Sequence, residues 1–152
     1  MDLYSVKAII VLDNDGERLC AKYFDEENSF PTTDYQTKFE ERLFDKTTNN
    51  DSEIILFDSF TVVYRSNVDL MFFVVGGCDE NELILNQVLE CFYECVTDVL
   101  RKNVEKSEFM AEYSQVLMVI DNMIDDGVIM EVDPDEVQQL SYSKTENKKK
   151  LF

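Results

Sequence analysis

Two runs of consecutive apolar residues constrain the fold of this chain more than any other feature of its sequence. Residues 8–12 read AIIVL and residues 70–75 read LMFFVV, so neither run alternates apolar with polar positions. Successive side chains of a strand point to opposite faces of its sheet, so both faces of these strands need cover. The pattern therefore predicts a sheet that lies between two layers of helices.

Turn residues divide the remaining strand-like segments. The run Asp13-Asn14-Asp15-Gly16 separates two apolar segments, and a DG step in that position is typical of a tight hairpin. Three later segments are separated by steps too short for a crossover helix, so they are expected to form an antiparallel meander. The five expected strands cover residues 3–12, 17–24, 53–57, 60–65 and 69–75.

Three helices are expected from apolar periodicity and from capping residues. The first covers residues 33–46 and is opened by Thr33 with Gln36, and the second covers 80–102 and is opened by Asp79 with Glu82. The third runs over 107–125 and stops at Asp125-Asp126-Gly127. A minor helical turn is expected at 133–136, with Pro134 at its first position.

These elements follow the order β-β-α-β-β-β-α-α, which predicts an α+β fold with three layers, α/β/α. The helix at 33–46 is expected on one face of a five-stranded antiparallel sheet, and the other two helices on the opposite face. Neither a repeat nor a linker divides the sequence, so residues 1–140 are expected to form one domain. Residues 141–152 are polar and rich in lysine, and we expect a mobile tail.

The composition excludes most enzyme chemistries. The chain has no histidine and four glycines, so it contains neither a histidine-based triad nor a glycine-rich phosphate loop. The two aspartate–glycine turns fail the ligand spacing of a calcium loop. We therefore expect a protein that is not an enzyme and that has no cofactor and no metal. Four cysteines lie in or beside apolar runs and are expected to be reduced core thiols of a cytosolic protein: Cys20, Cys78, Cys91 and Cys95.

The charge of the chain restricts its partners. The chain has 14 basic and 32 acidic residues, of which four lysines and one glutamate fall in 142–152, so residues 1–141 keep 10 basic against 31 acidic groups, a net charge of −21. Such a surface repels nucleic acid and anionic lipid, and direct membrane insertion is not expected. A partner with a basic surface is the natural complement.

The first helix is the predicted partner surface. Its spacing places Tyr35, Phe39 and Leu43 in one row, with Phe44 about 100° around the helix from Leu43. One or two of these side chains are expected to stay partly exposed, and the alternative is that all four pack on the sheet. Acidic residues are expected to form a rim around them: Asp34, Glu40, Glu41 and Asp45. The candidate partner-binding residues are Tyr35, Phe39, Glu40, Glu41, Leu43 and Phe44.

Four long blocks of the sequence carry a family resemblance. They read VKAIIVLDNDGERLCAKYF (6–24), DSEIILFDSFTVVYRSNVDLMFFVVGG (51–77), ENELILNQVLECFYECVTDVLRKNVEK (80–106) and IDNMIDDGVIMEVDP (120–134). In order and spacing these blocks resemble the coatomer zeta subunits, a branch of the adaptor-complex small subunits with a longin-like fold. More distantly the chain resembles the sigma small chains, which share ENEL (80–83) and an Asn-Val step, here at Asn103-Val104.

The resemblance implies a non-enzymatic structural subunit of the COPI vesicle coat. It implies pairing with the helical solenoid of a gamma-type large subunit, and recruitment of the coat to Golgi membranes by an Arf-family GTPase. The implied location is cytoplasmic, peripheral on Golgi membranes and COPI-coated vesicles, in Golgi-to-ER retrograde and intra-Golgi transport. Two alternatives stay open, a sigma-type small chain of a clathrin adaptor complex and a freestanding longin-like interaction module.

Overall fold

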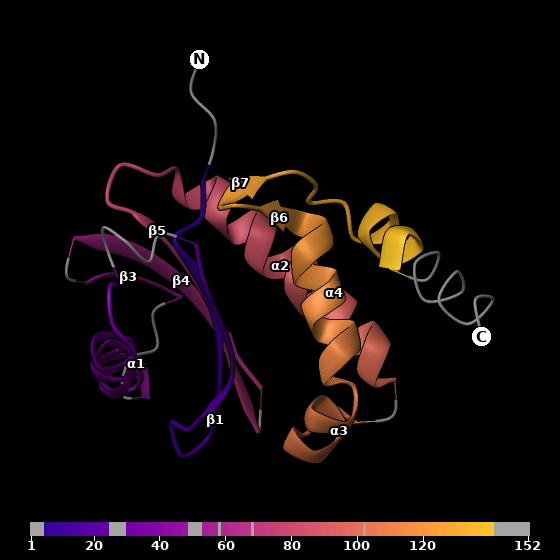
Figure 1. Cartoon of the computed structure of the whole chain (residues 1–152), viewed down its shortest axis with the longest axis horizontal. Coiled ribbons are helices and arrows are strands. Elements are labelled where there is room, and N and C mark those ends of the chain that lie inside the picture. The colour runs from indigo at the N-terminus through magenta and orange to yellow at the C-terminus, as the bar shows by residue number, and fades with distance from the viewer. Residues whose placement is uncertain are drawn as a thin grey trace.

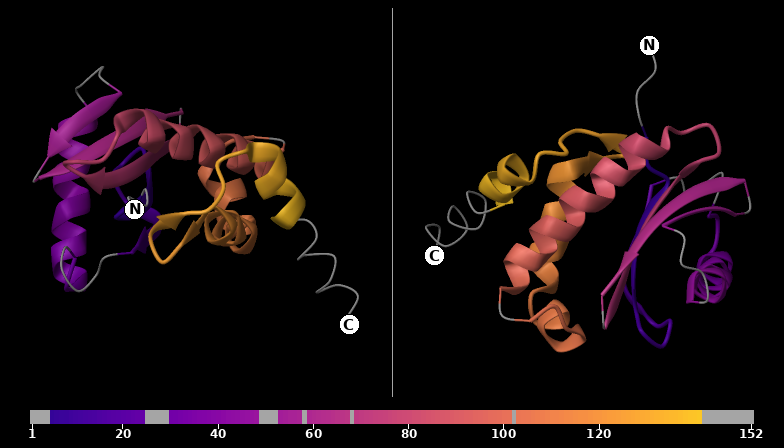
Figure 2. Two further views of the ribbon diagram at one scale, coloured as in Figure 1. Left: turned by 90° about the horizontal axis from the view of Figure 1, so that it is seen from above. Right: turned by 180° about the vertical axis from the view of Figure 1, so that it is seen from behind.

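A sheet lies between two helical layers, as Figure 1 shows. The computed structural model describes residues 5–24, 30–48, 53–57, 59–67, 69–101 and 103–141. Helix α1 lies on one side of the sheet, and α2, α3 and α4 lie on the other, an arrangement that the views from above and behind also show (Figure 2). The predicted three-layer α+β architecture and its element order are confirmed through α2.

The sheet has five antiparallel strands in the order β2-β1-β5-β4-β3. The strands are β1 (Ala8–Asp13), β2 (Arg18–Tyr23), β3 (Ile54–Phe57), β4 (Phe60–Ser66) and β5 (Leu70–Gly77). The two consecutively apolar runs form β1 and β5, which are neighbours inside the sheet and are buried from both sides. The expectation that both faces of these strands need cover is confirmed.

The two faces of the sheet divide the core. Along β1, Ile9 and Val11 face the layer of α2, whereas Ile10 and Leu12 face α1. The same alternation continues along β5, so each apolar strand supplies two separate hydrophobic clusters.

The helices have the bounds α1 (Thr33–Thr48), α2 (Glu82–Leu100), α3 (Lys106–Ala111) and α4 (Tyr113–Met123), and residues 134–141 are also helical. The expected helical turn near Pro134 is confirmed: Pro134 is its first residue, and the Asp133 carboxylate accepts from the N–H of Asp135 at 3.0 Å. The prediction of a mobile tail from residue 141 is wrong at its first residue, because Ser141 belongs to this helix, is buried and donates to the carbonyl of Val137 at 2.9 Å. Residues 142–152 lie outside the described residues, so their mobility stays a prediction.

The single helix predicted at 107–125 is wrong. It is interrupted at Glu112 between α3 and α4, where no Gly or Pro marks the break in the sequence. After α4 the chain forms a two-stranded hairpin, β6 (Ile124–Asp125) with β7 (Val128–Ile129). Asp126 and Gly127 both have positive φ, 49° and 85°, so the DG step closes a hairpin turn instead of ending a helix.

Both predicted capping boxes are displaced. The hydroxyl of Thr32, not Thr33, accepts from the N–H of Tyr35 at the start of α1. Asn81 caps α2 by accepting from the N–H of Leu83 at 2.9 Å. Asp79 cannot cap this helix because it lies in the turn after β5, where the N–H of Glu80 bonds to the carbonyl of Gly77.

The four cysteines are free thiols, and three of them lie in the cluster beneath α2. Burial raises the pKa of Cys20 to about 11. A hydrogen bond with Cys95, together with burial, raises the pKa of Cys91. Cys78 is exposed in the turn after β5, so its predicted place in the core is wrong.

Candidate functional site

Aromatic side chains hold α1 on the sheet. Phe30, just before the helix, packs its ring 5.0 Å from that of Phe39 and 5.2 Å from that of Phe60 on β4. Leu43, one turn after Phe39, is also fully buried. Large rings therefore fill the space between α1 and the sheet. Phe39 and Leu43 belong to this part of the hydrophobic core.

A buried carboxylate joins α1 to the edge strand β2. Both oxygens of Glu40 accept from the Arg18 guanidinium, one of them at 3.0 Å from Nε, and Oε2 also accepts from the Tyr23 hydroxyl at 2.5 Å. The bonds to Glu40 raise the pKa of Arg18, and burial followed by the bond to Glu40 raises the pKa of Tyr23. Glu40 is 5% exposed, so its predicted position in a solvent-exposed rim is wrong.

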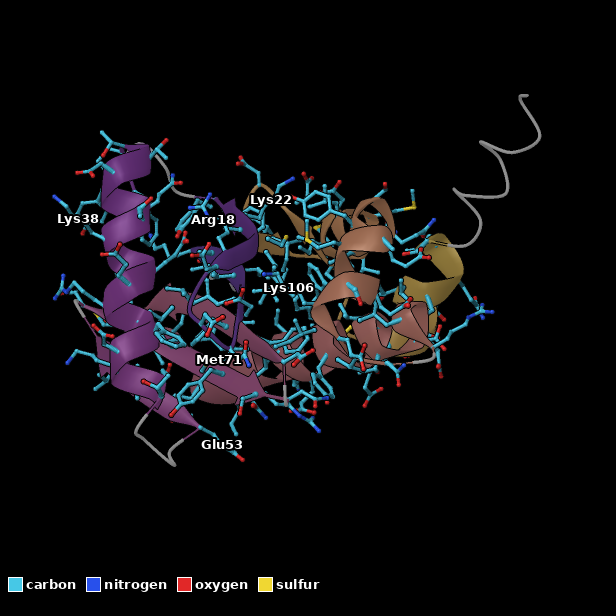
Figure 3. All side chains as sticks on the ribbon, turned by 90° about the horizontal axis from the view of Figure 1, so that it is seen from below. Arg18, Lys22, Lys38, Glu53, Met71 and Lys106 are labelled. Carbon is cyan, nitrogen blue, oxygen red and sulfur yellow. The ribbon has the colours of Figure 1, made fainter. Side chains whose placement is uncertain are left out.

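Some of the predicted partner-binding residues lie on the outer surface of α1. Tyr35 is 43% exposed, Glu41 is exposed and Phe44 is half-buried. The expectation of one or two partly exposed apolar side chains is thus confirmed. Phe44 packs on the hairpin turn, where a Cβ at Gly16 would come within 2.8 Å of its ring. In Figure 3, Lys38 points outward from α1 while Arg18 lies on the strand beside it.

A polar pocket of about 340 Å³ lies between α1 and the β1–β2 turn. It contains four carboxylates and one guanidinium, and its lining residues are Asp15, Gly16, Glu17, Arg18, Thr37, Glu40 and Glu41. Since Arg18 is already bound by Glu40, the remaining carboxylates give the mouth of the pocket a negative character. The pocket fits a lysine or arginine side chain of a partner better than an anion.

Asp13 fixes the turn that forms one wall of this pocket. Its carboxylate accepts from the N–H groups of Asp15 and Glu17, each at 2.9 Å, and from Lys106 Nζ of α3 at 2.9 Å. Burial alone would raise the pKa of Asp13, but the bonds from Lys106 and from the two backbone groups outweigh it and hold that pKa below the ordinary value of 3.8. One buried carboxylate therefore positions the turn against α3.

Sequence reasoning missed several exposed apolar side chains outside α1. They are Ile54, Leu56, Leu83, Met110, Tyr113, Met130 and Leu140. Two of them lie on β3, whose apolar run IILF reads as a buried strand. The length of this run could have indicated the exposure, because a four-residue strand lies at an edge of a sheet more often than at its centre.

The described residues show no catalytic constellation. Within the ranges that the structure covers, no group of three or more Cys, Asp or Glu side chains could hold a metal ion, and no helix is long and apolar enough to cross a membrane. A second pocket, of about 420 Å³, lies between α2 and residues 131–134. Its most buried nucleophile, Cys91, has a raised pKa, which disfavours the reactive thiolate.

Comparison with known proteins gives one consistent result. Residues 5–147 match the family model described as clathrin adaptor complex small chain. Coatomer subunit zeta-1 of Homo sapiens is 47% identical over 89% of this chain and 75% of its own length. Coatomer subunit zeta of Saccharomyces cerevisiae is 34% identical over 90% of this chain and 77% of its own. A homology model of the full-length AP-3 complex in a stretched open conformation matches with a TM-score of 0.71 at 11% identity, covering 96% of each chain, and shows a shared fold.

Proposed function

Because this chain belongs to the clathrin adaptor complex small chain family, and within it to the coatomer zeta subunits, we propose that it is the small structural subunit of a COPI-type vesicle coat. In that role it pairs with a gamma-type large subunit and takes part in Golgi-to-ER retrograde and intra-Golgi transport. It acts without catalysis and without a cofactor. The coat is recruited to the membrane by an Arf-family GTPase, so the chain itself needs no membrane insertion.

The observation that carries this proposal is the extent of the identity to coatomer zeta-1, which covers 89% of the chain. Identity of 47% over nearly a whole domain relates this chain to the zeta branch in particular. A likeness of fold alone would not distinguish that branch from the other small chains. The match to the AP-3 complex, at 11% identity, supports the longin-like architecture and says nothing of the partner.

The test is co-expression of the full chain with a gamma-type large subunit and, separately, with the large subunit of a clathrin adaptor. We expect stoichiometric co-elution with the gamma-type subunit only. Co-elution with the clathrin-adaptor subunit instead would favour the sigma-type alternative. A chain that stays monomeric beside both would favour a freestanding interaction module.

We further propose that the outer surface of α1 and the neighbouring pocket contact this partner. Tyr35 supplies an exposed ring, Glu41 and Asp15 supply charge, and Phe44 lies between them on the turn. Phe39, Leu43 and Glu40 support the surface from beneath, since all three are buried. Rim charges act mainly on the rate of association, through long-range attraction to a basic partner.

The corresponding experiment reverses Glu41 to Lys, with Glu94→Lys on the exposed side of α2 as the matched control. We expect Glu41→Lys to slow association about tenfold at low salt, and the control to change it much less. Tyr35→Ala should speed dissociation. Equal rates for Glu41→Lys and Glu94→Lys would place the partner elsewhere, without affecting the proposed coat membership.

A further inference from the structure

We propose that the outer edge of β3 is a strand-addition site for an extended partner segment. The occupant has aliphatic or β-branched residues at alternating positions and lysine or arginine at both ends. This site goes beyond the proposed coat membership, since it lies on a different strand from the α1 surface and its chemistry does not depend on which large subunit binds.

The hydrogen-bond register leaves the backbone of β3 available on its outer side. Phe57 pairs with Phe60 across a two-residue turn, and the N–H of Tyr64 bonds to the carbonyl of Glu53 at 3.0 Å. In an antiparallel pair the bonding residues alternate, so the N–H and C=O groups of Ile54 and Leu56 point away from β4. Among the described residues, β3 pairs with β4 alone.

The same two residues expose their side chains. Ile54 is 39% and Leu56 is 72% exposed, whereas Ile55 between them packs on the cluster beneath α1. Leu56 lies in one cross-strand row with Thr61 and Gly76. Helix α2 covers that row at Gly76, where a Cβ would come 2.8 Å from Leu85. The helix therefore covers β5 and leaves the end of the row on β3 open.

The opposite edge of the sheet is protected in a way that β3 is not. On β2, Arg18 is paired with Glu40 of α1, and Lys22 is paired with Asp121 of α4 at 3.1 Å. The β1–β2 ladder also has a register shift at Val11/Leu12. Charged residues and bulges are the usual protection of an edge strand, and the sequence IILF of β3 contains neither lysine nor proline.

Charge decides between possible occupants. The sequence places Asp51 and Glu53 before the strand and Asp58 directly after it. Antiparallel pairing of β3 with a second copy would bring these acids opposite one another, which disfavours self-association. A segment with basic ends meets opposite charges at both ends of β3, so a heterologous basic-flanked strand is the occupant that fits.

The proposal is tested on the full chain by NMR titration with the synthetic peptide KKVTVTVKK. We expect the amide signals of Ile54 and Leu56 to shift, and their hydrogen exchange to slow by at least about tenfold at saturation. The same peptide N-methylated at every residue of its VTVTV segment has no backbone N–H there to donate from either edge, and it should bind about tenfold more weakly or worse. The acid-flanked peptide EEVTVTVEE should not bind at all.

Two substitutions in the protein test the same site. Leu56→Pro removes an outward N–H without touching the ladder to β4, and Leu56→Lys adds an edge charge that repels the basic peptide. Both should weaken binding of KKVTVTVKK about tenfold or more, with unfolding transitions that show each variant to be folded. The proposal is overturned by an absence of binding, by equal binding of the N-methylated or acidic peptide, by shifts confined to another surface, or by a dimer of the chain alone that protects the same amides.

Discussion

The two faces of the sheet are built by different means. Beneath α2 the core is aliphatic and aromatic from β2 to β4 and holds three thiols. Its one buried charge among the described residues, Asp13, lies at the end of β1. Beneath α1 the core is smaller, rich in rings, and bounded by the buried Glu40 with its partners Arg18 and Tyr23.

The two helices are therefore held on the sheet by different kinds of interaction. A long apolar helix such as α2 is held by the area that it buries, and many side chains share that burial. Helix α1 has a narrower apolar stripe, and the directional bonds that Arg18 and Tyr23 donate to the Glu40 carboxylate define its position relative to β2. We therefore expect the α2 face to govern the stability of the fold and the α1 face to depend strongly on a single polar residue.

The largest effect is expected from Phe92→Ala on α2. Phe92 is fully buried and packs edge-to-face on Phe72 of β5 at 5.8 Å. Its truncation leaves a cavity, so the free energy of unfolding should fall by about 3–5 kcal/mol. Urea unfolding measures this loss. If Phe92→Ala proved milder than the replacement of Glu40, the proposed division between the two faces would be wrong.

The second-largest loss of stability is expected from Glu40→Gln on α1. The variant places an amide N–H₂ against the Arg18 guanidinium and loses a charge-assisted bond. The free energy of unfolding should fall by about 1–3 kcal/mol, less than for a fully buried pair because the Arg18 side chain is 36% exposed. Glu41→Gln is the matched control, since the neighbouring Glu41 is exposed, and it should stay within about 0.5 kcal/mol of the parent. Equal losses would show that the carboxylate network does not hold α1.

Asp13→Asn probes the charge at the end of the α2 face. The folded pKa of Asp13 is lowered, so its stabilisation is present above the unfolded pKa and is lost as the pH falls through the folded pKa. At neutral pH the variant should be less stable by about 1–2 kcal/mol. The difference should shrink as the pH falls below about 4. Urea unfolding across this range measures it, and a difference independent of pH would contradict the assigned bonds.

The smallest effect on stability is expected at Cys78. It is exposed, whereas the other three thiols lie beneath α2. A thiol reagent should label one cysteine in the native chain and all four after denaturation. Cys78→Ser should abolish the native labelling and change stability by less than about 0.5 kcal/mol. Fast native labelling of Cys91 or Cys95 would show that the α2 face opens readily.

The sequence predicted the sheet better than the details around it. The runs at 8–12 and 70–75 required cover on both faces, and the structure supplies it. The break at Glu112 was missed because it leaves the apolar spacing unchanged. The capping residues were displaced by one or two positions, since several adjacent residues can cap and tertiary contacts decide which of them does.

The candidate surface on α1 was predicted only in part. Helical spacing places Tyr35 in the same row as Phe39 and Leu43, so it does not predict that Tyr35 stays exposed while the other two are buried. Glu40 was placed in the rim because glutamate is seldom buried without a partner. Its partners lie on β2, and no local pattern shows that Arg18 and Tyr23 will meet it.

The hairpin of β6 and β7 has a consequence for the synthesis of the chain. The N–H of Val6 bonds to the carbonyl of Gly127 at 2.7 Å, and Ser5 pairs with Val128. The segment just before β1 can therefore form these bonds only after most of the chain has been translated, an interval on the order of ten seconds at typical elongation rates. During that time the nascent segment lacks these partners, and a ribosome-bound intermediate should still exchange its Val6 amide with solvent.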